Sequence, residues 1–358
     1  MRLAALLQAN GDYEAAVSML EETSRRHPRH PAVWLALGRL ALDRNNPEGA
    51  LRALEHLDKL PDAGPARQRL AVFLAFHQGK FAEAADGLEL LLAAAPDAAL
   101  LSTFTDASVR AGRSESAIAR LRAMIENMLA GISPALPYAL LAQVHQASGR
   151  LDQAEEAFRQ AIAAQPANAA TGIRVALARL LVQKNKSEEA RTLLSEILAA
   201  LPSGDGGETV RLALAMTEER LGNTGEALRQ YEEILSTNPN SIVAANNLAA
   251  IVADHYNDDP DRLMRALNHV NRFATAKNSL QLDTLAWIYY RQGRFKNAHD
   301  LLHRADAANH LNAAVRFHYG AVLLALGRSE DGRRLIEKVV QEDFLGWEEA
   351  RRLLAATP

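Results

Sequence analysis

Apolar residues recur along most of the chain at positions i, i+3, i+4 and i+7, which places them on one face of an α-helix. The two clearest stripes hold Tyr138, Leu141, Ala142 and His145, and Leu282, Leu285, Ala286 and Tyr289. A turn containing Gly or Asn follows each stripe, then a second helical pattern and often a Pro. The pattern predicts an all-α chain built from helical hairpins.

A small residue early in the second helix repeats with a nearly constant period. It falls at Ala16, Ala50, Ala84, Ala117, Ala154, Ala190, Ala227, Ala266, Ala298 and Gly332. A small side chain there lets the paired helices approach closely. Because each hairpin exposes apolar surface on two sides, it must stack on its neighbours. The period predicts ten stacked units.

The chain resembles the tetratricopeptide repeat family, whose unit is a helix–turn–helix of about 34 residues. Trp34, Leu37 and Gly38 match the tryptophan, leucine and glycine of the family's first helix. The family's closing proline is matched by Pro28, Pro96, Pro166, Pro202 and Pro239. The resemblance covers nearly the whole chain and implies a right-handed superhelical solenoid of about ten repeats.

The expected domain organisation is a single solenoid over residues 1–358, with a capping helix at 344–358. Breaks in the period favour subdivisions at 1–131, 132–202 and 208–343. In the capping helix we expect Phe344, Leu345 and Trp347 to pack on the last hairpin and Arg351 and Arg352 to stay in water. The first unit starts in the middle of its first helix, so we expect a fragment of a longer chain.

Charge and composition limit the classes of molecule that we expect the chain to bind. The chain carries 40 basic and 43 acidic residues, so its electrostatics give no reason to expect nucleic acid or an anionic membrane as the main partner. It contains no Cys, which excludes a disulfide framework and Cys-ligated zinc. No apolar run approaches the roughly 18 residues that span a bilayer. We expect a protein or peptide partner. The sequence leaves open whether the chain forms an oligomer or joins a larger assembly.

Enzyme motifs are missing. The sequence lacks phosphate-binding glycine loops, a nucleophile elbow and an H-E-x-x-H pair, and its eleven His are scattered. The acidic turn with Asp254, Asp258, Asp259 and Asp261 lacks the spacing of a calcium loop, which leaves a surface loop or a partner contact. We expect no catalytic residue, no metal and no cofactor.

The resemblance implies that successive first helices line a concave binding face. Residues one step round from the core stripe are Arg39, Arg69, Phe73, Phe76, Asp106, Arg110 and Arg179, and then Asn246, Asn247, Asp283, Thr284, Trp287, Tyr290, Arg291, Phe317 and His318. The second group suits peptide recognition, because Trp, Tyr and Arg dominate interface hot spots. The alternative is that Trp287 and Tyr290 fill space between neighbouring first helices.

The function predicted is a non-catalytic scaffold for protein interactions. The first helices lack the lysine, asparagine and arginine clamp with which some family members grip a carboxyl-terminal peptide. The segments NNLAAIVADHY and LDTLAWIYYRQGRF are similar to repeats of bacterial envelope proteins linked to exosortase and polysaccharide export. That similarity implies a periplasmic role in exopolysaccharide assembly. The alternatives are a cytoplasmic adaptor and the repeat region of a larger enzyme or membrane protein.

Overall fold

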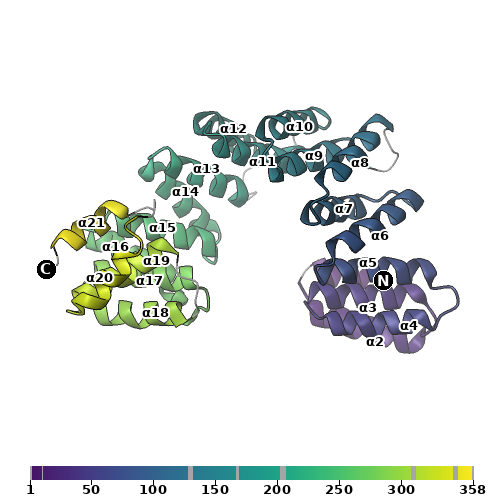
Figure 1. Cartoon of the computed structure of the whole chain (residues 1–358), viewed down its shortest axis with the longest axis horizontal. Coiled ribbons are helices and arrows are strands. Elements are labelled where there is room, and N and C mark those ends of the chain that lie inside the picture. The colour runs from purple at the N-terminus through teal and green to yellow at the C-terminus, as the bar shows by residue number, and fades with distance from the viewer. Residues whose placement is uncertain are drawn as a thin grey trace. The chain divides into compact units, whose positions relative to one another are not determined.

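The computed structural model of the chain describes residues 2–9, 11–127, 132–166, 169–201, 207–307, 312–341 and 346–356. Within these ranges the chain forms α-helices, one 3-10 helix and no strand (Figure 1). The chain divides into two compact units, Met1–Leu180 and Leu181–Pro358. The boundary lies inside one helix, and the finer subdivisions at 131 and 202 stay predictions.

The helices of the first unit follow one another through short turns. They are α1 (Arg2–Ala9), α2 (Tyr13–Arg26), α3 (Pro31–Asp43), α4 (Pro47–Asp58), α5 (Gly64–His77), α6 (Phe81–Ala94), α7 (Ala98–Arg110), α8 (Ser114–Asn127), α9 (Ala135–Ala147), α10 (Leu151–Ala163) and α11 (Thr171–Gln183), which crosses the boundary.

The second unit continues the same alternation. It holds α12 (Ser187–Ala200), α13 (Glu208–Arg220), α14 (Thr224–Thr237), α15 (Ile242–His255), α16 (Pro260–Val270), the 3-10 helix η2 (Asn271–Thr275), α17 (Ser279–Arg291), α18 (Phe295–Ala307), α19 (Ala313–Ala325), α20 (Ser329–Glu337) and α21 (Trp347–Ala356). Odd-numbered helices from α1 to α19 are the first, or A, helices, and the even-numbered ones are the B helices. The order gives the ten predicted A–B pairs.

The periodic small residues lie where the helices meet. All nine alanines of the series, from Ala16 to Ala298, are fully buried. Gly332, the tenth member, lies so close to α19 that an added Cβ would meet the carbonyl oxygen of Gly320 at 2.8 Å. The small side chain is therefore required by helix separation, as the sequence predicted.

The A-to-B turns share a backbone conformation, a residue with a positive φ. In nine of the ten turns one residue has a positive φ, which is Gly in seven turns and Asn in two. Gly293 has φ 72° and Asn45 has φ 53°, a left-handed conformation that these two residue types tolerate best. The exception is the turn between α15 and α16. There Asp259 caps α16 by accepting a hydrogen bond of 2.9 Å from the Arg262 amide.

The closing prolines lie just beyond their B helices, as in Pro28 after α2, where Pro cannot continue the helical hydrogen bonds. Pro28 also meets the next repeat, because the indole N–H of Trp34 donates to its carbonyl oxygen at 2.8 Å. The Trp34 ring stacks on His56 at 3.9 Å between centroids. Pro202 lies outside the described residues.

The capping helix differs from its prediction in the residues that it buries. Trp347 is 37% exposed, whereas Ala350 is fully buried and Leu353 and Leu354 are half-buried against the core of the second unit. Trp347 lies in the first turn, and the Arg351 guanidinium lies 4.8 Å from its ring centroid. Arg351 and Arg352 are exposed as expected. Phe344 and Leu345 lie outside the described residues.

We predict that Gly320→Ala loosens the last hairpin. Its Cβ would meet Ile336 Cγ1 at 2.5 Å, and overpacking of this kind costs about 1–3 kcal/mol. Hydrogen exchange in α19 and α20 should then be faster by about 5- to 150-fold. Gly225→Ala in α14 is the matched control, because nothing lies within 4 Å of its added Cβ. Equal exchange in both variants would contradict the close approach.

Candidate functional site

One stripe of α17 carries four of the predicted binding residues together with Leu280. Leu280, Asp283, Thr284, Trp287 and Arg291 are spaced at three, four, seven and eleven residues from Leu280, so they share one face of the helix. The core stripe that begins at Leu282 occupies a different face. The A helices on either side, α15 and α19, pack against α17.

Trp287 lies at the centre of an aromatic stack and is only 2% exposed. Its ring stacks on Tyr290 at 4.6 Å and on His318 of α19 at 3.9 Å between centroids, with Phe317 edge-on at 5.7 Å. Its indole N–H donates to the Asp254 carboxylate of α15 at 2.8 Å. In this structure Trp287 therefore joins three consecutive A helices and has almost no surface left for a partner.

Other predicted residues form hydrogen bonds from one A helix to the next. The Thr284 hydroxyl donates to the Asn246 side-chain oxygen at 2.9 Å. His318 Nδ1 lies 2.9 Å from an oxygen of the buried Asp283 carboxylate. Since each bond crosses between neighbouring hairpins, these side chains fix the spacing of the repeats. We call this set, with the Trp287–Asp254 bond, the inter-helix ladder.

Asn247 belongs to a second polar group that links α13, α14 and α15. Its amide donates to the hydroxyl of the fully buried Tyr231 at 2.9 Å, and that hydroxyl donates to Glu219. Burial raises the pKa of Tyr231 far above its ordinary value, and the bond to Glu219 raises it further. Burial also raises the pKa of Glu219. The group is a neutral-phenol network that holds repeats together.

Arg291 ends the α17 stripe and reaches the capping helix. Its guanidinium makes two hydrogen bonds of 2.9 Å to the two carboxylate oxygens of Glu349 in α21. The same guanidinium lies 4.4 Å from the Trp287 ring centroid. Burial raises the pKa of the neighbouring Tyr290, and the charge of Glu349 raises it further. The Arg291 guanidinium is thus bound on its edge by a carboxylate and on its face by an aromatic ring.

In the first unit the predicted residues are paired locally. Arg39 is exposed and lies over the Phe73 ring at 4.8 Å. Arg69 lies 3.7 Å from the Asp97 carboxylate. Arg110 contacts Asp106, Phe76 and Phe81. Arg179 is exposed on α11. The structure does not gather these residues into a single site.

The sequence reasoning missed three exposed apolar residues at the start of α15 and α17. Ile242 and Val243 are each 49% exposed and Leu280 is 50% exposed. Val243 and Leu280 each lie about one helical turn before the Asn246–Thr284 bond, so they occupy the same end of two packed helices. Ile, Val and Leu are also the residue types of the core. Only the position of these three residues on the helix face could have identified them as exposed. They form what we call the apolar patch.

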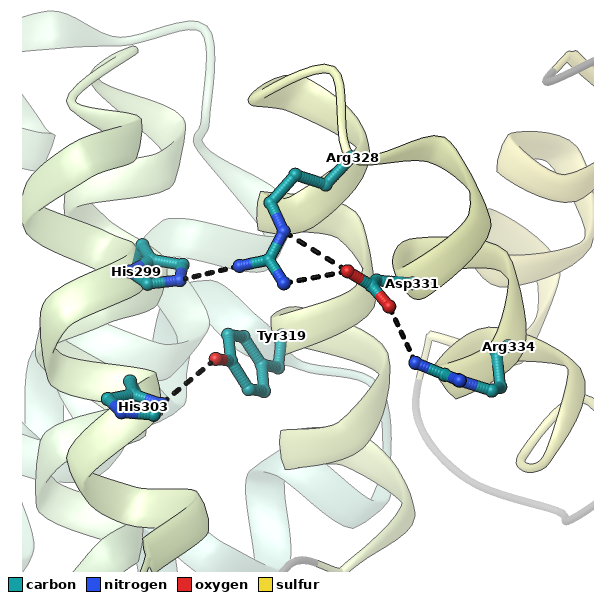
Figure 2. A network of polar contacts seen from close by, with 6 residues as sticks. All are labelled: His299, His303, Tyr319, Arg328, Asp331 and Arg334. Carbon is teal, nitrogen blue, oxygen red and sulfur yellow. Dashed lines mark hydrogen bonds and ion pairs between the residues drawn. The ribbon is translucent and has the colours of Figure 1, made fainter.

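The B helices of the last repeats carry a polar network (Figure 2). Two nitrogens of Arg328, Nε and Nη2, donate to the same oxygen of Asp331 at the start of α20, and its third nitrogen lies 3.3 Å from His299 Nε2 in α18 (Figure 2). The Tyr319 hydroxyl lies 3.4 Å from Nδ1 of His303, which is one helical turn after His299 in α18. Across the described residues no group of three or more metal-ligating side chains occurs. The network joins α18, α19 and α20.

His145, a core-stripe residue of α9, is buried with its Nδ1 lacking a hydrogen-bond partner among the described residues. Burial lowers its pKa, and the charges of Arg150 and Arg122 lower it further. His145 lines an open groove of about 460 Å³ between α8, α9 and α10. Its place on the core stripe and its burial are those of a packing histidine.

Comparisons with known proteins agree with this architecture. A tetratricopeptide repeat family profile matches residues 1–244, and a profile described as anaphase-promoting complex, cyclosome, subunit 3 matches residues 262–339. Since the first match covers more than half of the 358 residues, the chain belongs to the tetratricopeptide repeat family. The predicted all-α repeat fold is confirmed. No curated protein matches the chain.

Two solved structures show the same fold. A tetratricopeptide repeat protein from Parabacteroides merdae ATCC 43184 is 17% identical with a TM-score of 0.50, over 73% of this chain and 98% of that chain. The APC/C hetero-tetramer Cut9–Hcn1 is 12% identical with a TM-score of 0.53, over 99% of this chain and 82% of that chain. No described helix is long and apolar enough to cross a membrane.

We predict that Trp287→Ala lowers the free energy of unfolding by about 3–5 kcal/mol, the usual cost of truncating a buried aromatic residue. The loss includes the ladder bond to Asp254. Urea denaturation followed by circular dichroism measures it. Trp347→Ala is the control, because Trp347 is exposed and its loss should cost no more than about 0.5 kcal/mol. A similar small change in both variants would argue against the packing role.

Proposed function

We propose that the chain is a non-catalytic scaffold that binds a protein segment on the A-helix face of residues 181–358. The family's fold supports a protein-interaction role in general. The observation that carries the specific site is the apolar patch of Ile242, Val243 and Leu280, which are exposed at the starts of the neighbouring helices α15 and α17. Exposed apolar side chains gathered on a rigid base are typical of interaction surfaces.

The ladder gives the patch its rigidity. Two hydrogen bonds, Trp287–Asp254 and Thr284–Asn246, already join α17 to α15. The two helices therefore keep their spacing without a partner. A preorganised surface loses little conformational entropy on binding, so more of the contact energy appears as affinity. In this proposal the predicted aromatic and polar residues shape the site from beneath, and a partner touches the patch and the half-buried Asn246.

We predict that a photo-crosslinking amino acid at Leu280 captures a discrete protein partner in cells that express the chain. The same amino acid at Met264 of α16 is the control, since Met264 is 53% exposed but lies on a B helix. Adducts should form from the Leu280 position and be absent from the Met264 position. Equal capture from both positions, or from neither, would remove the assignment of the binding face.

The cellular context we propose is bacterial envelope assembly, in the periplasm and in support of exopolysaccharide export. The support is the similarity of the NNLAAIVADHY and LDTLAWIYYRQGRF repeats to envelope proteins. A cytoplasmic adaptor is the second candidate, favoured by the match of residues 262–339 to a subunit of the anaphase-promoting complex. The Cut9–Hcn1 hetero-tetramer shows that this fold can serve within a hetero-oligomer.

We predict that the natural full-length protein is released with the periplasmic fraction when the outer membrane is opened by osmotic shock. Immunoblotting of the fractions measures this, with one cytoplasmic and one periplasmic marker as controls. Retention with the cytoplasmic marker would contradict the envelope proposal and leave the adaptor.

A further inference from the structure

The bond between Arg291 and Glu349 connects residues 58 positions apart, from α17 to the capping helix α21. The Arg291 side chain is 13% exposed, and its buried Nε has no hydrogen-bond partner within the part of the chain that the structure describes. Its charge is met by Glu349 and by the face of Trp287. Arg291 lies on the same stripe as Leu280 of the apolar patch.

A guanidinium in this position requires a carboxylate. Bidentate Arg–carboxylate pairs are among the stronger hydrogen-bonded pairs, and their planar geometry is specific. Removing one partner of a largely buried pair leaves an uncompensated charge, which is strongly unfavourable. If Glu349 leaves, another carboxylate is therefore favoured at the same two nitrogens.

The helix that supplies Glu349 has a small interface of its own. It contains ten residues, and isolated helices shorter than about 12–15 residues are marginal in water. Ala350 is its one fully buried residue within the described range, and Leu353 and Leu354 are half-buried. Trp347 and both arginines of α21 are exposed. The Arg291–Glu349 pair is therefore a large part of what holds α21 in place.

We propose that α21 is an intramolecular occupant of a carboxylate site on the A-helix face, and that an acidic segment of a partner displaces it. The partner places its own carboxylate on Arg291 in place of Glu349 and reaches the apolar patch at the other end of α17. This inference rests on the proposed function for the path of the partner. Because α21 is tethered to the site, it competes at a high effective concentration and weakens partner binding until it is released.

Hydrogen exchange on the full chain tests the hold on α21. Glu349→Gln keeps the shape of the side chain and removes the charge, so amides of residues 347–356 should exchange about ten-fold faster, which corresponds to about 1.4 kcal/mol. Glu348→Gln is the matched control, since it changes the net charge equally at the adjacent, exposed position. Unchanged exchange in Glu349→Gln would overturn the role of the pair.

Binding of a fluorescent hexaglutamate peptide tests the exchange of carboxylates. Its affinity for Glu349→Gln should exceed that for the natural chain and for Glu348→Gln by about five-fold or more, because the internal competitor is weakened. Arg291→Gln should also release α21 yet show no such gain, since the site itself is lost. Equal affinity in all variants, or no binding to Glu349→Gln, would overturn the proposal.

The outcomes separate this inference from the proposed function. If a partner is crosslinked from Leu280 but Glu349→Gln does not bind the peptide more tightly, the scaffold function stands and the displacement of α21 is rejected. A peptide gain without capture from Leu280 would retain the carboxylate site and reject the apolar patch as the binding surface.

Discussion

The close approach of two helices at a single small residue is the constraint on which every repeat depends. Nine alanines and Gly332 occupy this position, and each is buried against its partner helix. At Gly320 and Gly332 the backbones come so near that no Cβ fits without displacement. The paired helices can stack on the next pair only at this separation, so the position of the A helices follows from it. The candidate binding face is a consequence of that stacking.

The same stacking decides which polar side chains are available for function. In the second unit, Trp287 contacts residues of α15 and α19, and Asp283 is bonded to His318. These groups are satisfied within the protein, because a polar group buried between helices is costly unless it is bonded. A partner therefore meets what lies beyond them, which is the apolar patch and the edge of Arg291. The ladder contributes to function by fixing that surface.

Much of the fold could be predicted from the sequence. Periodic Ala residues, turn Gly and Asn residues and closing prolines located all ten hairpins to within a few residues, because each type has a local conformational reason to be there. The site could be predicted less well. Helical periodicity placed Trp287 on the right stripe, but periodicity carries no information on whether the neighbouring helix covers it. Nor did the sequence indicate that Trp347, at the start of α21, would be 37% exposed.

The class of protein, the number of repeats and the position of each turn follow from the sequence, since these depend on residues within a single repeat. Which residues of the A helices are exposed depends on how the neighbouring repeats cover them. Asp254 and Trp287 are 33 residues apart and Arg291 and Glu349 are 58 apart, so their pairing requires the neighbouring repeats and the capping helix to be in place. Whether a side chain is buried depends on the neighbouring repeats, so it cannot be inferred from the sequence of one repeat.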